Sequence, residues 1–403
     1  EGALVKDDVF QYDSNYYKAS EDGSLYRSCW DGDSYYNQEG KQQRDCITEI
    51  NGISYCFGNG ELYKNELFYM KNPSTGDFCC FCADKDGHLI INDWGSGSYS
   101  DYYFGEDGAC CKDEIKEIDG KFYYFNWWDG ALLKNYSFSR DGYHYKTSAD
   151  GSLYQSCWND DSYYDQDGKQ IRDCITNING KYYCFDYNGK THKNELFRTE
   201  NPFTHDYCYF YATEDGHLIT NSWGTGDYAD CYFGEDGARC ENVIKEIDGK
   251  LYYFDSDGKL FKDTTFKYGG YYDSYYYKAS ADGSLYQSCW DGDSYYDQEG
   301  KQQRNIVIEI GDAYYGFSED GHLYVDTIFD ITDDEGWKIV GTYLADKNGK
   351  VRTDCTANTW NTDYYFDTDG KGYDGMKTVQ NVKYYYSDGE LRKNMAFTYD
   401  EVN

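Results

Sequence analysis

The chain has 403 residues and a formal net charge of −35, from 73 acidic and 38 basic side chains. Such a charge repels phosphate backbones and anionic lipids, which excludes nucleic acids and membrane surfaces as expected partners. Aromatic residues make up 20% of the chain, with 50 Tyr but only 2 Pro. Because Tyr buries much area while keeping a polar hydroxyl, this composition favours thin, stacked structures over one deep aliphatic core.

Three long repeats organise the sequence. The stretch "SCWDGDSYYNQEGKQ" from Ser28 returns as "SCWNDDSYYDQDGKQ" from Ser156 and as "SCWDGDSYYDQEGKQ" from Ser288. We therefore divide the chain into long repeats at 1–143, 144–271 and 272–403, with no flexible linker between them. A catalytic site is normally needed once, so a stretch that is kept three times indicates a binding surface that is offered several times.

Shorter units lie inside each long repeat. In "IKEIDGKLYYFDSDGKLFKD", from Ile244 to Asp263, two short strands flank Asp248-Gly249, which is a strong hairpin signal. No apolar spacing typical of a helix is sustained anywhere in the chain. We therefore predict an all-β fold, an elongated β-solenoid-like array of stacked hairpin repeats that is stapled by disulfides.

The cysteine positions suggest two of these disulfides. Sixteen cysteines are typical of an oxidising compartment. The third repeat has Ile306 and Gly316 where the first two repeats have cysteines, and this joint loss indicates a bonded pair. A three-residue loop ending on Gly52 or Gly180 would place the partners opposite each other. The predicted pairs are Cys46 with Cys56 and Cys174 with Cys184.

A third disulfide follows from what remains. The third repeat keeps only Cys289 and Cys355, which we predict to pair. The partners of Cys29 and Cys157 are then at other positions. Eight further cysteines have no assigned partner: Cys79, Cys80, Cys82, Cys110, Cys111, Cys208, Cys231 and Cys240.

The short unit resembles a known family. "IDGKLYYFDSDGKL" is similar to choline-binding or cell-wall-binding repeats, which also occur in bacterial glucan-binding and toxin C-terminal regions. The likeness is clearest at residues 115–134 and 244–262, and it implies a hairpin solenoid with ligand grooves between successive repeats. In that family Trp commonly follows the first turn Gly, whereas Lys121, Lys181 and Lys250 stand there in this chain.

The cysteine-rich long repeat also resembles the repetitive scaffoldins of anaerobic gut fungal cellulosomes. That resemblance implies a non-catalytic extracellular scaffold, whose cohesin-like sites dock the dockerin-type accessory modules of secreted plant-cell-wall hydrolases. The alternative is a carbohydrate or cell-wall (glucan or choline) binding anchor or adhesin, with polysaccharide as the partner, and a purely structural fibre is a third possibility. No nucleophile-elbow, zincin or Walker motif is present, so we do not expect an enzyme.

The candidate binding residues are aromatic side chains and carboxylates beside predicted turns. Trp and Tyr dominate binding hot spots, and the carboxylates would steer a partner. The first set is Trp30, Asp31, Asp33, Tyr35 and Tyr36, repeated as Trp158, Asp160, Asp161, Tyr163 and Tyr164, and as Trp290, Asp291, Asp293, Tyr295 and Tyr296. A second Trp column consists of Trp94, Trp223 and Trp360. The alternative for each column is a ring that fills the interior.

The sequence predicts no cofactor and no catalytic metal. Asp31, Asp33 and Glu39 are a possible structural calcium site, but they lack the spacing of an EF-hand. The sequon at Asn135 predicts glycosylation. With the cysteine count, it indicates a secreted protein, either free or attached to a cell surface through a part outside this chain. No apolar stretch approaches the length of a spanning helix, so no membrane insertion is expected.

Overall fold

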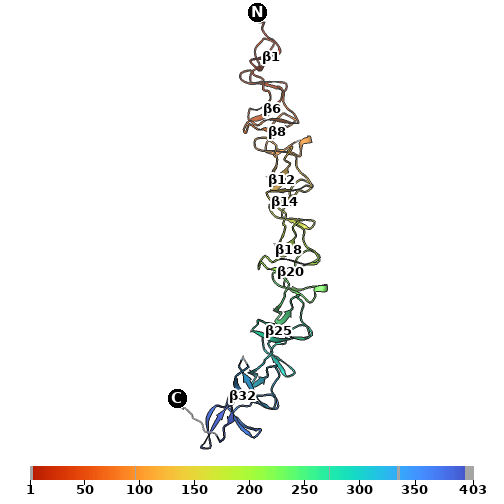
Figure 1. Cartoon of the computed structure of the whole chain (residues 1–403). Coiled ribbons are helices and arrows are strands. Elements are labelled where there is room, and N and C mark those ends of the chain that lie inside the picture. The colour runs from red at the N-terminus through yellow and green to blue at the C-terminus, as the bar shows by residue number, and fades with distance from the viewer. Residues whose placement is uncertain (1–2, 96, 272, 334–335, 395–403) are drawn as a thin grey trace. The chain divides into compact units, whose positions relative to one another are not determined.

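The computed structural model describes residues 3–95, 97–271, 273–333 and 336–394. The chain divides into two compact units, Glu1–Lys193 with Glu214–His217, and Asn194–Thr213 with Leu218–Asn403. In this described part the helical elements are two single turns, η1 (Gly97–Tyr99) and η2 (Gly226–Tyr228), and all other elements are strands (Figure 1). No helix there is long and apolar enough to cross a membrane. The division into three long repeats stays a prediction.

The first unit contains consecutive two-stranded antiparallel hairpins. Their strands are β1 (Asp8–Tyr12), β2 (Asn15–Ala19), β3 (Cys29–Asp31), β4 (Ser34–Tyr36), β5 (Cys46–Ile50), β6 (Ile53–Phe57), β7 (Glu66–Lys71), β8 (Phe78–Ala83), β9 (Asp93–Trp94), β10 (Tyr103–Phe104), β11 (Glu114–Ile118), β12 (Lys121–Phe125), β13 (Ser137–Arg140), β14 (Tyr143–Lys146), β15 (Cys157–Asn159), β16 (Ser162–Tyr164), β17 (Cys174–Ile178) and β18 (Lys181–Phe185).

The second unit continues the pattern and ends in a five-stranded sheet of order β33-β34-β37-β36-β35. Its strands are β19 (Glu195–Glu200), β20 (Tyr207–Ala212), β21 (Ser222–Trp223), β22 (Tyr232–Phe233), β23 (Val243–Ile247), β24 (Lys250–Phe254), β25 (Thr264–Gly269), β26 (Ser274–Ala279), β27 (Cys289–Asp291), β28 (Ser294–Tyr296), β29 (Ile306–Ile310), β30 (Ala313–Phe317), β31 (Thr327–Thr332), β32 (Ile339–Ala345), β33 (Cys355–Thr359), β34 (Thr362–Phe366), β35 (Gly375–Val379), β36 (Val382–Ser387) and β37 (Glu390–Leu391).

Two-residue turns close many of the hairpins. Asp248 and Gly249 have φ of 50° and 77°, so both central residues lie in the left-handed region that a type I′ turn requires. The hairpin predicted between Ile244 and Asp263 is confirmed, since Ile247 pairs with Lys250. The three-residue loop expected to end on Gly52 is wrong, because Ile50 pairs directly with Ile53 around a two-residue turn.

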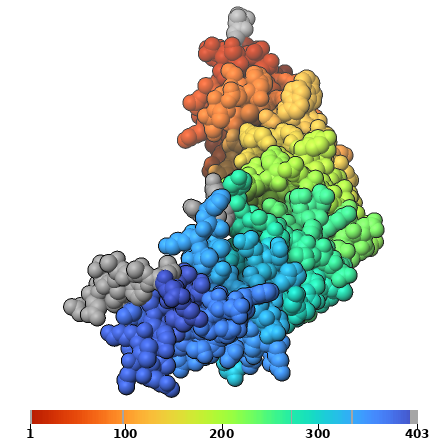
Figure 2. All heavy atoms as spheres, turned by 60° about the horizontal axis from the view of Figure 1, so that its bottom comes forward, coloured from red at the N-terminus to blue at the C-terminus, as the bar shows by residue number. Residues whose placement is uncertain are grey.

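The segment that follows a hairpin commonly bonds to two hairpins at once. After β6, the backbone N–H of Leu62 donates to the carbonyl of Asp33 at 3.0 Å, and that of Tyr63 donates to Cys56 at 2.9 Å. We call such a segment a connector. Because such connectors link a hairpin to the preceding one within each unit, these hairpins depend on their neighbours. Figure 2 shows successive segments of each unit packed against one another in chain order.

The core lies where the second strand of each hairpin ends. This last residue is almost fully buried in hairpin after hairpin, as Phe57, Phe125, Phe185, Phe254, Phe317 and Phe366. In other hairpins the position holds Tyr or the smaller Ala, for example Tyr36, Tyr164, Tyr296, Ala83, Ala212 and Ala279. The predicted all-β fold of stacked hairpins, with aromatic rather than aliphatic cores, is therefore confirmed.

One connector turn carries a carboxylate whose pKa is depressed. Asp22 Oδ1 accepts hydrogen bonds from Ser20 Oγ at 2.6 Å and from the backbone N–H of Ser24 at 2.8 Å. These bonds stabilise the ionised form, so the pKa of Asp22 falls to about 2. Equivalent bonds from other serines lower two more pKa values. Ser148 and Ser152 act on Asp150, and Ser280 and Ser284 act on Asp282.

This turn predicts a loss of stability in acid. A depressed carboxyl pKa contributes stability that is present above the unfolded value, about 3.9, and is lost as the pH falls through the folded value. The melting temperature should therefore fall between about pH 4 and pH 2. Replacing Asp22, Asp150 and Asp282 together with Asn should flatten this fall. Replacing Glu21, an exposed neighbour, with Gln should not. Identical acid profiles for all three proteins would contradict the assignment.

Candidate functional site

Five aromatic clusters with the same arrangement recur in the part of the chain that the structure describes. In each, a Trp on the first strand of a hairpin faces a Tyr on its second strand. A Tyr and a buried Phe from the second strand of the next hairpin complete the cluster. We call these the Trp clusters, and their members are Trp30–Tyr35–Tyr55–Phe57, Trp94–Tyr103–Tyr123–Phe125, Trp158–Tyr163–Tyr183–Phe185, Trp223–Tyr232–Tyr252–Phe254 and Trp290–Tyr295–Tyr315–Phe317.

The first cluster illustrates the geometry. The ring centroid of Trp30 lies 5.0 Å from those of Tyr35 and Tyr55, and 5.8 Å from that of Phe57. Tyr55 and Phe57 are two residues apart on β6, so they share one face of the strand. Phe57 is fully buried, whereas Trp30 is 38% exposed. The cluster is thus a partly exposed aromatic surface on a buried Phe, flanked by two Tyr rings.

The clusters keep this exposure in other copies. Trp158 and Trp290 are 38% and 39% exposed, and Trp94 and Trp223 are half-buried. Sugar rings pack against flat aromatic faces of this kind, while neighbouring Tyr hydroxyls provide polar contacts. Each cluster is therefore chemically suited to binding a sugar unit.

The structure divides the predicted Tyr pair. The first Tyr of each pair, Tyr35, Tyr163 or Tyr295, lies opposite the Trp in the hairpin register. The second, Tyr36, Tyr164 or Tyr296, is buried in the core. The second Tyr therefore belongs to the interior because neighbouring strand residues point to opposite faces of the hairpin.

Several predicted carboxylates form ion pairs within the chain. Asp31 pairs with Lys18 and Asp291 with Lys278, and these hydrogen bonds raise the pKa values of both lysines. Asp161 Oδ1 lies 2.7 Å from Lys193 Nζ, which lowers the pKa of Asp161 and raises that of Lys193. These contacts use the carboxylates to hold neighbouring segments together.

Two of the remaining predicted carboxylates also contact basic side chains of the same chain, and a third lies at a turn. Asp33 pairs with Lys64 at 2.5 Å, and Asp293 lies 2.9 Å from His322 Nδ1. Asp160 sits at a turn with φ of 53°. The possible calcium ligands do not converge either, because Asp31, Asp33 and Glu39 contact three different lysines, Lys18, Lys64 and Lys41.

Most residues of the two predicted Trp columns have the same surroundings in the structure. Trp94 and Trp223 make the same contacts as Trp30, Trp158 and Trp290. Trp360 differs from these, because it is a turn residue with φ of 55° and is 94% exposed. Sequence reasoning missed the Tyr and Phe that the next hairpin contributes. The signal was the Tyr-x-Phe ending of its second strand, as in "YYF" at residues 123–125.

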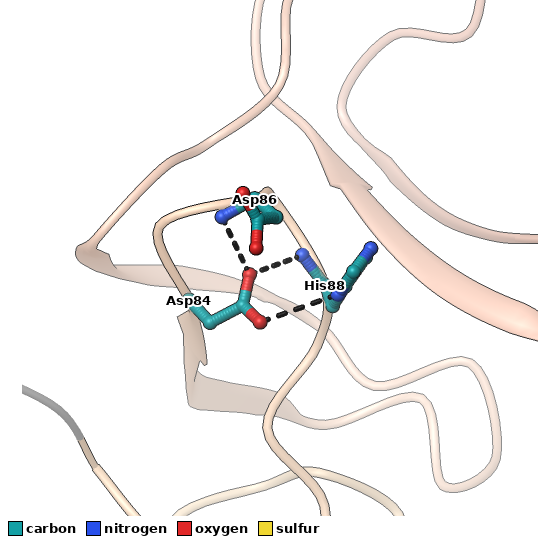
Figure 3. Close-up of side chains that lie close together, drawn as sticks. All are labelled: Asp84, Asp86 and His88. Carbon is teal, nitrogen blue, oxygen red and sulfur yellow. Dashed lines mark hydrogen bonds and ion pairs between the residues drawn. The ribbon is translucent and has the colours of Figure 1, made fainter.

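A compact group of metal-type ligands lies at one connector turn. Asp84 Oδ1 accepts hydrogen bonds from the backbone N–H groups of Asp86 and His88, at 2.8 and 2.9 Å, and His88 Nδ1 lies 3.2 Å from Asp84 Oδ2 (Figure 3). The three side chains lie close enough to share an ion. The carboxylate of Asp84 is already used to close the turn, and the His88 ring packs on Tyr55 at 5.0 Å.

The hairpin register corrects the geometric argument for the first two disulfides. Cys46 lies opposite Phe57, and Cys56 lies opposite Ile47. Adjacent positions on paired strands point to opposite faces, so the two thiols do not face each other. In the second copy, Cys174 lies opposite Phe185 and Cys184 opposite Ile175. The expected directly opposite pairing is therefore wrong in both copies.

The third predicted pair, Cys289 with Cys355, stays a prediction. Cys289 and Cys355 lie in two different sheets, opposite Tyr296 and Phe366. The described cysteines are in the reduced form in this structure. Burial raises the pKa values of Cys56 and Cys184 to about 12, which leaves these thiols protonated and poorly nucleophilic near neutral pH.

The predicted glycosylation residue lies on the surface. Asn135 is exposed and precedes β13, with φ of 51°, and its backbone N–H donates to the carbonyl of Ser148 at 2.9 Å. The side chain is therefore accessible, and its modification stays a prediction.

Comparison with known proteins gives matches among curated sequences and among solved structures. No protein-family model matches the sequence. The chain is 25% identical over 417 residues to glucosyltransferase-I of Streptococcus downei, covering 96% of this chain and 24% of that protein. It is also 25% identical over 241 residues to glucosyltransferase-S of Streptococcus mutans serotype c, covering 57% of this chain and 14% of that protein. The chain thus spans a quarter or less of these curated relatives.

Several of the similar solved structures come from Streptococcus pneumoniae. The modular autolysin LytC matches with 14% identity and a TM-score of 0.41, over 64% of this chain and 52% of that one. The choline-binding domain of CbpL matches with 18% identity and a TM-score of 0.21, over 62% of this chain and 99% of that one. These four proteins are two glucosyltransferases, an autolysin and a choline-binding protein. The scaffoldin resemblance is not supported by them.

Proposed function

We propose that this chain is a non-catalytic, secreted binding segment whose Trp clusters hold a neutral, glucose-based polysaccharide. The observation that carries the proposal is the fivefold recurrence of one partly exposed Trp on the same Tyr and Phe support. A polymer of repeating sugar units can occupy several such clusters at once, which multiplies weak individual contacts into strong binding.

Two further observations support a neutral glucan. The net charge of −35 would repel an anionic polymer but not an uncharged one. The curated relatives are named glucosyltransferases, and nearly all of this chain aligns with part of one of them. The secreted location rests on the sixteen cysteines and remains part of the proposal.

The docking of hydrolase modules is the less favoured function. The acidic patch on which it depended is engaged within the chain, through pairs such as Asp31 with Lys18 and Asp33 with Lys64. The second Tyr of the patch is buried. A partner would therefore meet the Trp and first Tyr with most of the expected steering carboxylates already paired within the chain.

A binding comparison tests the proposed ligand. The full chain is mixed with insoluble glucan, with choline resin, and with an unrelated insoluble polysaccharide, and the protein left in solution is measured. We expect depletion by glucan that soluble gluco-oligosaccharide reverses and free choline does not. Binding to the choline resin alone, with elution by choline, would replace the proposed ligand. Failure to bind any of the three supports would contradict the binding function.

A single-cluster variant tests the site. Trp290→Leu keeps an apolar side chain over Phe317 but removes the aromatic face. We expect calorimetry with a soluble gluco-oligosaccharide to give four sites per chain instead of five, because each cluster binds separately. The lost site should have contributed about 2 kcal/mol or more if Trp290 is a hot spot.

The matched control is Trp337→Leu, because Trp337 is 87% exposed and belongs to none of the Trp clusters. It should keep five sites. If Trp290→Leu lowers the melting temperature and leaves the stoichiometry unchanged, the Trp290 ring is structural rather than part of a binding site.

A further inference from the structure

Two cysteines left without a partner by the sequence lie against each other in the first unit. The backbone N–H of Cys110, in the connector after β10, donates to the carbonyl of Cys80 on β8 at 2.9 Å. The two thiols form a side-chain hydrogen bond. Both are buried, in one cluster with Cys82 and Phe104. The pair therefore links the connector after the β9–β10 hairpin to the preceding β7–β8 hairpin.

The same two positions are paired in the second unit, by different chemistry. The backbone N–H of Arg239 donates to the carbonyl of Tyr209 at 2.8 Å, which repeats the hydrogen bond between Cys110 and Cys80. The Arg239 guanidinium lies 4.4 Å from the centroid of the Tyr209 ring, in a cation–π contact. Both cysteines are thus replaced together, and the replacements also contact each other.

A further copy near the C-terminus has the same backbone bond. The N–H of Gly372 donates to the carbonyl of Thr342 at 2.7 Å, and neither residue is a cysteine. The site therefore holds two cysteines or none. If the two thiols were independent, single replacements would be equally acceptable, whereas a bonded pair accounts for joint replacement.

We propose that Cys80 and Cys110 form a disulfide bond in the protein folded under oxidising conditions. Backbone segments joined by such N–H to carbonyl hydrogen bonds approach closely, with facing Cα atoms about 5.5 Å apart in paired strands, within the range of disulfide-bonded cysteines. Their side chains also meet inside one buried cluster. This is the relation that the register denies to Cys46 and Cys56.

The bond forms by exchange with an external disulfide such as oxidised glutathione. The Cys110 thiolate attacks one sulfur of the oxidant and releases one molecule of reduced thiol. The Cys80 thiolate then attacks the mixed disulfide and releases the second. The two cysteines lose two protons and two electrons, and the oxidant is reduced to two thiols. Accepting the hydrogen bond from Cys80 lowers the pKa of Cys110, which favours Cys110 as the first nucleophile.

Disulfide mapping tests this bond directly. The full chain is refolded with oxidised and reduced glutathione, blocked with an alkylating agent, and digested without reduction. We expect a cross-linked pair of peptides, one containing Cys80 and the other Cys110. Because Cys79, Cys82 and Cys111 lie on the same peptides, three single variants assign the bond. Cys80→Ser should abolish the cross-link, whereas Cys79→Ser and Cys111→Ser should keep it.

A second variant separates loss of the bond from loss of folding. Changing Cys80 to Tyr and Cys110 to Arg copies the pair from the second unit. It should fold with unchanged circular dichroism and give no cross-link. Adding a reductant should lower the melting temperature of the parent protein but not that of this variant. Persistence of the cross-link in Cys80→Ser, or complete alkylation of both thiols in the oxidised parent, would overturn the proposal.

Discussion

Replacing all five tryptophans of the Trp clusters with Leu is expected to lower the apparent affinity for insoluble glucan by about 10²- to 10⁴-fold. The size of the effect follows from multivalency. When one cluster on a polymer-bound chain releases its sugar unit, the others hold the polymer close, so that rebinding is fast. Removing every aromatic face removes this gain together with the individual contacts. Single-site affinities for a soluble oligosaccharide measure the individual contacts. Binding isotherms on insoluble glucan, compared with them, measure the gain from multivalency.

The chain itself offers the control for this experiment. Four further tryptophans lie outside the clusters and are strongly exposed, namely Trp127, Trp128, Trp337 and Trp360. Replacing these four with Leu removes nearly as many aromatic rings but leaves each cluster intact. Its affinity for glucan should stay close to that of the parent protein. If this variant loses affinity and the five-cluster variant does not, the binding surface consists of the exposed rings instead.

Phe125→Ala is expected to destabilise the first unit by about 3–5 kcal/mol, as is typical for a buried Phe replaced by Ala. Phe125 is fully buried and packs with Tyr103, Ile118 and Cys111 beneath Trp94. Its loss leaves a cavity at the level where one hairpin meets the next. Because each hairpin depends on its neighbours, we expect the defect to lower the unfolding midpoint in denaturant for several hairpins together.

The comparison for this variant is Phe78→Ala, since Phe78 lies on β8 and is 75% exposed. Its free energy of unfolding should change by no more than about 0.5 kcal/mol, as is usual for surface substitutions. Equal unfolding midpoints for the two variants would mean that the column of buried Phe residues does not hold the stack together.

The local structure was readable from the sequence because its causes are local. An Asp-Gly or Asn-Gly pair adopts the left-handed conformations of a two-residue turn, and that turn sets the strand register next to it. The hairpin between Ile244 and Asp263 was predicted for this reason, and the pairing of Ile247 with Lys250 confirms it. The repeated Trp at positions 30, 158 and 290 was also evident from the sequence alone.

The register of the β5–β6 hairpin shows where prediction from the sequence failed. The loss of two cysteines together in the third repeat suggested a bond between Cys46 and Cys56, given a three-residue loop. The two-residue turn shifts the pairing by one position, and a shift of one position turns a side chain to the other face. Cys46 and Cys56 therefore do not face each other, although the surrounding hairpin was correctly predicted.

What the sequence by itself determined is thus the hairpin, its turn and the recurrence of its aromatic residues. Only the tertiary structure decided which residues meet between hairpins. It placed Tyr55 beside Trp30, buried Tyr36, joined Asp33 to Lys64 and brought Cys80 against Cys110. The physical reason is that connectors hydrogen-bond to carbonyls of the preceding hairpin, as Leu62 does to Asp33. These contacts join residues far apart in the chain, and no local pattern of turn or alternation encodes them.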